Sequence, residues 1–102
     1  MYNVKVVIPV YSNDHIKYDK QIISNINNSI LDISNGYSVY NGKGIWKDDD
    51  NHVYQDLNMF YDILVETKKQ ILLLKNIVIE LKSILSQKSI FFSVTKEDVS
   101  FL

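Results

Sequence analysis

Hydrophobic residues recur along this chain with two different periods, one typical of strands and the other of helices. Val and Ile dominate residues 3–11, which predicts a buried strand, and Pro9 near its end indicates an edge or a bend. Residues 37–41 and 89–95 predict two more strands. Residues 53–66 alternate with period two and predict a long strand, whose apolar face holds Leu57, Met59, Tyr61, Ile63 and Val65.

Two other segments carry apolar residues at helical spacing. The first runs from about Lys17 to Asn35, and Asn35-Gly36 predicts its end because Gly adopts a left-handed cap without strain. The second, residues 68–86, carries a broad apolar stripe. The resulting order β-α-β-β-α-β predicts a single α+β domain over residues 1–102. We expect a ferredoxin-like split β-α-β sandwich, with an antiparallel sheet and two helices on one face.

The other face of such a sheet must be solvated or covered by a partner. It would carry Lys5, Val7, Tyr40 and Asp62 among several apolar residues. This mixed composition favours sheet-to-sheet contact, so we expect a homodimer or higher homo-oligomer. Two apolar residues on the outer ridge of the second helix form another candidate contact. The predicted interface residues are Tyr11, Phe60, Leu64, Phe91, Leu72 and Ile79.

Residues 36–51 hold all three glycines and the only tryptophan. Gly42-Lys43-Gly44 predicts a turn or bulge, Ile45-Trp46-Lys47 a brief return to a strand, and Asp48 to Asn51 a second turn. The Gly-Lys-Gly sequence lacks the spacing of a phosphate loop. Both a plain turn and a backbone nest that holds an anion beside Lys43 fit it. Trp46 can either stack on a ligand ring or pack against a helix or a second subunit.

Composition narrows the classes of function. A net charge of −1 creates no overall field that favours nucleic acid or an anionic membrane. All eleven basic residues are Lys, so no guanidinium is present to read bases or grip phosphate. The chain has no cysteine, and no apolar run approaches the roughly 20 residues of a membrane span. We therefore expect a cytoplasmic protein with no DNA, RNA or membrane partner.

The sequence predicts no catalytic residue, no metal site and no cofactor. The acidic turn from Asp48 resembles a metal-binding loop, but Val53 and Met59 stand where an EF-hand needs Gly and Glu. His15 and His52, the only histidines, lie in no metal-binding or triad spacing. We therefore expect residues 48–52 to form a solvated hairpin tip.

Several short motifs spread over most of the chain match a known pattern. The pattern is Gly-x-Thr-Val, Gly-x-Gly-x-Trp, an acidic turn, Gln-x-Ser-Val and a terminal Val-x-Phe. The matching residues are Gly36-Tyr37-Ser38-Val39, Gly42-Lys43-Gly44-Ile45-Trp46, Asp48 to Asp50, Gln87-Lys88-Ser89-Ile90 and Val99-Ser100-Phe101. The chain thereby resembles a family of small uncharacterised α+β domains of bacteria and phages, from which Ser38 and Ile90 are conservative departures. The resemblance implies this fold and, for members on mobile elements, an accessory or anti-defence role.

These observations lead to three hypotheses of function. The first is a non-enzymatic protein, from a phage or mobile element, that sequesters a small anionic or nucleotide-like signalling ligand of the host. Its predicted ligand-binding residues are Tyr40, Gly42, Lys43, Gly44, Trp46 and Lys47, with the aromatic rings stacking and the lysines meeting anionic groups. The second is a protein-interaction inhibitor or scaffold acting on a host protein. The third, which rests on fold analogy, is a small dimeric enzyme that uses His15 or His52.

Overall fold

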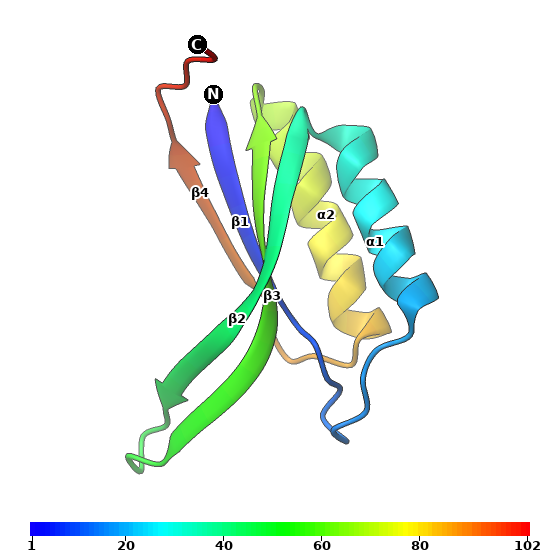
Figure 1. Ribbon diagram of the computed structural model, residues 1–102, viewed down its shortest axis with the longest axis vertical. Helices are drawn as coiled ribbons and strands as arrows, with labels where there is room; N and C mark the ends of the chain where they lie inside the picture. The colour runs from blue at the N-terminus through cyan, green and yellow to red at the C-terminus, as the bar shows by residue number, and fades with distance from the viewer.

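A computed structural model describes residues 1–102 and contains one four-stranded antiparallel sheet with the order β2-β3-β1-β4. Both helices lie on one side of this sheet (Figure 1). This arrangement is the ferredoxin-like sandwich that the hydrophobic pattern predicts. The elements are β1 (Tyr2–Pro9), α1 (Lys20–Ile33), β2 (Gly36–Lys47), β3 (Val53–Val65), α2 (Lys68–Ile84) and β4 (Phe91–Lys96).

The core lies between the helices and the two central strands. All twelve buried residues are hydrophobic, and β1 and β3 supply Val4, Val6, Ile8, Tyr61, Ile63 and Val65. The period of two puts these residues on the helix-facing side of the sheet, as predicted. The buried Tyr61 hydroxyl donates a hydrogen bond of 2.6 Å to Asn27 Oδ1. Desolvation raises the pKa of Tyr61 to about 12, with a further contribution from Tyr37.

Side-chain caps determine where both helices begin. Asp19 accepts a hydrogen bond of 2.7 Å from the backbone N–H of Gln21, so α1 starts three residues later than the apolar spacing predicts. Thr67 and Gln70 form a capping box at the start of α2. Gly36 does not cap α1 as predicted, since it begins β2 with a φ of 143°. Neither helix is long and apolar enough to cross a membrane.

The predicted turn at Gly42-Lys43-Gly44 is wrong, because β2 runs through it without interruption and pairs with β3 along its whole length. The glycines give room to side chains that lean across from β3. A Cβ atom at Gly42 would lie 2.8 Å from the ring of Phe60, and one at Gly44 would lie 2.7 Å from the amide nitrogen of Asn58. At these two positions glycine therefore leaves space for side chains of the paired strand and does not form a bend.

The far ends of β2 and β3 form a two-stranded hairpin arm, residues 43–57. Strand β1 pairs with β3 only from Asn58 to Val65, so no third strand accompanies the arm. Figure 1 shows the arm projecting away from the helices at the end opposite the chain termini. Its apolar side chains are uncovered, with Ile45 69% and Val53 70% exposed. Larger exposed apolar patches are often contact surfaces, which makes the arm a candidate for one.

The loop between β1 and α1, residues 10–19, is tied to the end of α2. The Tyr18 hydroxyl donates a hydrogen bond of 2.7 Å to the Leu85 carbonyl oxygen, and Asn13 donates one of 3.0 Å to the Ser86 carbonyl oxygen. Tyr11 forms an isolated bridge with Lys17 inside the loop. These contacts hold the loop beside the base of the hairpin arm.

Candidate functional site

Alternate residues of β2 point to opposite faces of the sheet, and this divides the predicted ligand-binding residues. Tyr37 pairs with the core residue Ile63, so odd-numbered positions of β2 face the helix side. Lys43 and Lys47 belong to this group. The other four predicted residues lie on the open face: Tyr40, Gly42, Gly44 and Trp46. The structure therefore does not bring the lysines and the aromatic rings together on one face, as the sequence-based hypothesis requires.

The open face of the hairpin carries two stacked aromatic pairs. Tyr40 stacks on Phe60 with ring centroids 5.5 Å apart, and Trp46 stacks on Tyr54 with centroids 4.4 Å apart. Trp46 Nε1 also donates a hydrogen bond of 2.7 Å to a carboxylate oxygen of Asp56. Because Trp46 remains 51% exposed, one side of its ring system is open to another group. Aromatic faces of this kind accept a planar ligand by offset stacking.

A hollow of about 610 Å³, which we call the aromatic basin, lies beside this face. One wall is the hairpin arm, and the other is the loop between β1 and α1. The residues that line it include Tyr11, His15, Trp46, Tyr54, Asp56 and Gln87. Its size falls within the range of about 300–1,000 Å³ that is typical of small-molecule sites.

The aromatic basin carries negative charge and no lysine. Asp56 is the only carboxylate that lines it, and His15 lies exposed at its edge with a φ of 61°. A carboxylate repels phosphate groups and favours neutral or cationic ones. The chemistry of the basin therefore suits a ring-containing ligand that hydrogen-bonds to a carboxylate.

The predicted interface residues fall in three places. Phe60, Leu64 and Phe91 lie on the open face of the sheet, with Phe60 and Phe91 both paired to Val7. Leu72 and Ile79 are exposed on α2, at 58% and 55%. Tyr11, predicted on the sheet face, lies instead beyond the end of β1 in the aromatic basin, because β1 stops at Pro9.

The acidic hairpin tip uses its polar groups to shape the turn. Asp48 accepts hydrogen bonds from the backbone N–H groups of Asp50 and His52 and from the Tyr54 hydroxyl, at 2.9, 3.0 and 3.1 Å. Desolvation acts to raise the pKa of Asp48, but these hydrogen bonds outweigh it and hold the pKa below its ordinary value. The Asp48, Asp50 and His52 ligand atoms lie within 4.8 Å of one another, yet His52 is 71% exposed. The side chain of Asp48 thus stabilises the turn, and residues 48–52 form the hairpin tip that the sequence predicts.

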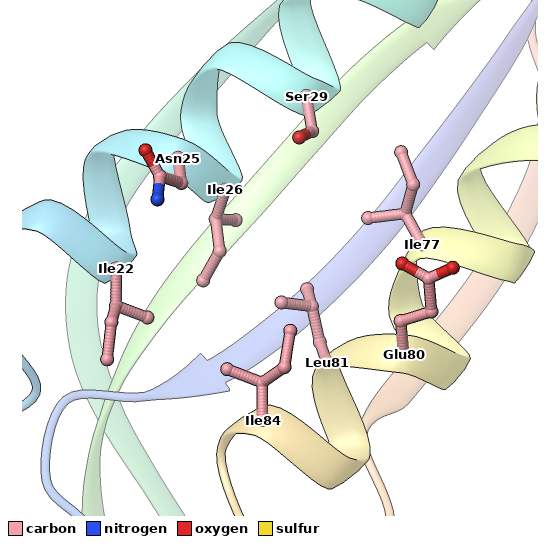
Figure 2. A pocket seen from close by; sticks show the side chains of 8 residues that line it. All are labelled: Ile22, Asn25, Ile26, Ser29, Ile77, Glu80, Leu81 and Ile84. Carbon is pink, nitrogen blue, oxygen red and sulfur yellow. The ribbon is translucent and has the colours of Figure 1, made fainter.

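Another hollow, smaller and more apolar than the aromatic basin, lies between the two helices. It measures about 160 Å³ and is lined mainly by isoleucines and Leu81, with Glu80 at its edge. Figure 2 shows the isoleucine side chains of α1 and α2 pointing toward each other across it. Because it is small and has few polar groups, we interpret it as a groove between the packed side chains of α1 and α2.

Sequence reasoning missed Tyr54, Asp56 and Gln87. The first two lie on the same face of the long strand as Phe60, and the turn at residues 48–52 pairs Trp46 directly with Tyr54. The predicted break at Gly42-Lys43-Gly44 concealed this pairing. If β2 is taken as continuous, pairing residues outward from the turn at 48–52 predicts the contact between Trp46 and Tyr54. The sequence carries no comparable signal for Gln87, which reaches the basin through tertiary packing.

Comparisons with known proteins establish the fold. No family model matches the chain, and no curated protein matches it. A phage SAM lyase in complex with S-methyl-5'-thioadenosine superposes with a TM-score of 0.69 over 93% of this chain and 80% of that chain, at 12% identity. CutA from Pyrococcus horikoshii superposes with a TM-score of 0.62 over 99% and 88%, at 7% identity. A variant of CutA1 from Pyrococcus horikoshii OT3 gives 0.60 over 99% and 87%, at 8% identity.

Proposed function

We propose that this protein binds a small nucleoside-like ligand in the aromatic basin. The observation that carries the proposal is the exposed Trp46 ring, stacked on Tyr54 and oriented by Asp56, at the wall of a hollow of about 610 Å³. The phage SAM lyase, which shares the fold, is in complex with S-methyl-5'-thioadenosine. S-methyl-5'-thioadenosine is an adenosine derivative without a phosphate group, so it carries no negative charge that Asp56 would repel.

The proposed contacts divide the ligand between stacking and hydrogen bonding. A purine ring would stack on the open side of Trp46, a contact worth about 1–3 kcal/mol. One Asp56 oxygen holds Trp46, and the remaining acceptor positions of the carboxylate can take an exocyclic amine or a ribose hydroxyl. The side-chain carbonyl oxygen of Gln87 offers one more acceptor at the basin. The ligand class thus shifts from the anionic one that the sequence suggests toward neutral or cationic nucleosides.

We further propose that the biological role is sequestration and that the protein acts as a homo-oligomer. Encoded by a phage or another mobile element, it would withhold a host signalling ligand from its receptor. The uncovered apolar side chains of the hairpin arm support assembly, since a second copy resting on the arm would bury Ile45 and Val53.

A small enzyme is the second candidate, and His15 is the observation that favours it. His15 lines the aromatic basin, and imidazole is the side chain best suited to proton transfer near neutral pH. Incubation with SAM, followed by chromatography, tests this candidate. Consumption of SAM that is lost in His15→Ala supports catalysis, whereas unchanged SAM in the presence of bound ligand supports sequestration.

Calorimetry and thermal shift with S-methyl-5'-thioadenosine, SAM, adenosine, AMP and ADP-ribose test the binding proposal. A ligand at 100 times its Kd adds about 2.7 kcal/mol of stability and raises Tm by several degrees. We expect the nucleosides to bind, and Trp46→Ala to weaken nucleoside binding about tenfold or more. Ile45→Ala is the matched control, because Ile45 is the exposed neighbour on the opposite face of the strand. Equal nucleoside binding by Trp46→Ala and the parent would overturn the proposal.

A further inference from the structure

A second large hollow, which we call the lysine basin, lies on the helix side of the hairpin. It measures about 540 Å³, is open to solvent, and is bordered by the first turns of α1, the end of the β1–α1 loop and the middle of β2 and β3. Its polar lining includes Lys17, Lys20, Ser24, Asn28 and Asn41. The β1–α1 loop lines both the aromatic basin and the lysine basin and lies between them, so the two hollows are distinct.

The charge of the lysine basin is positive and unneutralised. No carboxylate lines it, and neither Lys17 nor Lys20 takes part in an ion pair, since the pairs in the structure are Lys5–Asp62 and His52–Asp48. Asp19 lies between the two lysines in sequence, but its carboxylate caps α1 through the Gln21 N–H. The aromatic basin and the helix groove, by contrast, each contain a carboxylate. The lysine basin is therefore the hollow that favours an anion.

Three uncharged polar side chains of the basin also lack a hydrogen-bond partner in the protein. The side chains of Ser24, Asn28 and Asn41 make no hydrogen bond within the protein. Asn27 accepts the Tyr61 hydroxyl through its oxygen, which leaves its NH₂ group free to donate. Hydroxyl and amide groups both donate and accept, and so they match a ligand with several hydroxyl groups. Lys43, two residues beyond Asn41, faces the same side of β2 but does not line the basin.

We propose that the lysine basin binds a phosphorylated small molecule of the sugar phosphate or nucleoside monophosphate class. The phosphate group contacts Lys17 and Lys20, which act as point charges, while the amides and Ser24 hydrogen-bond the hydroxyl-bearing body. This function goes beyond nucleoside binding and does not depend on it, because it uses other residues on the opposite face. Lys43, predicted from the sequence to meet an anion beside Trp46, lies on the opposite face of β2 from that ring.

NMR titration of the full, ¹⁵N-labelled chain with ribose 5-phosphate, ribose, inorganic phosphate and AMP tests the proposal. We expect ribose 5-phosphate and AMP to shift the side-chain amide signals of Asn28 and Asn41. Ribose should leave these signals unchanged, and inorganic phosphate should bind at least tenfold more weakly than ribose 5-phosphate. Raising the ionic strength to 1 M should weaken binding strongly, because the lysines are exposed. If inorganic phosphate binds as tightly as ribose 5-phosphate, the amides contribute nothing and the proposal is wrong.

Lysine variants locate the site. The double variant Lys17→Met/Lys20→Met should weaken ribose 5-phosphate binding at least tenfold. Lys68→Met/Lys69→Met is the matched control, since it removes two exposed lysines from the start of the other helix and should change the affinity less than twofold. Equal loss in both variants would show a general charge effect and overturn the proposal. Trp46→Ala should leave the affinity for ribose 5-phosphate unchanged, which separates this result from the nucleoside test.

Discussion

The two faces of the β2–β3 hairpin differ in almost every chemical property, although the same strands form both. The open face carries stacked rings and the carboxylate of Asp56, whereas the helix-side face leads to a hollow with free lysines and amides. Trp46 and Lys47 are neighbours in sequence yet point to opposite faces. A slip of one residue in strand register would exchange every one of these side chains. The pleat of β2 thus separates Trp46 from Lys47, whereas Lys17 and Lys20 reach the helix-side hollow from the β1–α1 loop and α1.

This difference should appear in the response of each basin to salt. Stacking on Trp46 depends on contact between rings and depends little on ionic strength, whereas attraction to exposed lysines is screened beyond a Debye length of about 8 Å at physiological salt. The two basins share one wall, the loop tied down by Tyr18, but no charged side chain lines both. Changes that act on one face should therefore leave the other intact.

The largest expected effect comes from a side chain added against the Phe60 ring on the open face. In Gly42→Val, the new Cβ would meet the Phe60 ring at 2.8 Å and displace it from Tyr40. We expect a loss of about 1–3 kcal/mol in the free energy of unfolding, measured in urea, because overpacking of this kind costs that much. Ser38→Val adds the same side chain on the same face at an exposed position and serves as the control. Ribose 5-phosphate binding should persist in both variants, and its loss in Gly42→Val alone would break the separation of the faces.

A smaller effect on stability is expected from the alkaline titration of Tyr61, which hydrogen-bonds a residue of the lysine basin. Tyr61 hydrogen-bonds Asn27, which lines that basin, and the pKa of Tyr61 is raised to about 12 in the folded state. An unfolded tyrosine titrates near 10, so the stabilising contribution is complete below pH 10 and is lost as the pH rises toward 12. We expect the free energy of unfolding to fall by an amount on the order of 1–2 kcal/mol over this window.

Tyr61→Phe provides the control for that titration. The variant should be less stable than the parent at neutral pH, since Asn27 loses its donor, but its stability should fall less between pH 10 and 12. Parallel decreases in the two proteins would show that Tyr61 does not cause the alkaline effect. Nucleoside binding at the open face should be the same in both proteins at pH 7.

The smallest effect is expected from removing the charge of the aromatic basin. Asp56→Asn keeps an oxygen that accepts from Trp46 Nε1 but abolishes the negative charge. A unit charge about 4 Å away in water contributes about 1 kcal/mol, so AMP binding in this basin should improve roughly fivefold. Nucleoside affinity should change less than that of AMP. Asp49→Asn, at the exposed hairpin tip, controls for net charge, and equal gains from the two substitutions would argue against a local role for Asp56.

Most of the fold follows from local patterns. The alternation along β3 places Tyr61, Ile63 and Val65 in the core, and the apolar stripe of α2 does the same for Leu74, Val78 and Leu81, as predicted. Where prediction fails, tertiary contacts override local preference. Glycine at positions 42 and 44 predicts a turn, but the leaning side chains of Phe60 and Asn58 explain why small residues belong within a strand there. The start of α1 likewise depends on the loop contacts of Tyr18 and on the cap at Asp19.

For the candidate sites, too, local sequence patterns determined some features and tertiary contacts determined the others. The sequence alone determined the element order, the core faces and the segment around Trp46 as the unusual part of the chain, because these depend on residue type and short-range spacing. Only the tertiary structure decided which side chains meet. Cross-strand pairing set Trp46 against Tyr54, and the pleat placed Lys43 on the other face. The β1–α1 loop lies between two hollows, whereas the sequence predicted a single set of ligand-binding residues. Contacts between residues far apart in sequence depend on register and packing, and a linear pattern does not contain them.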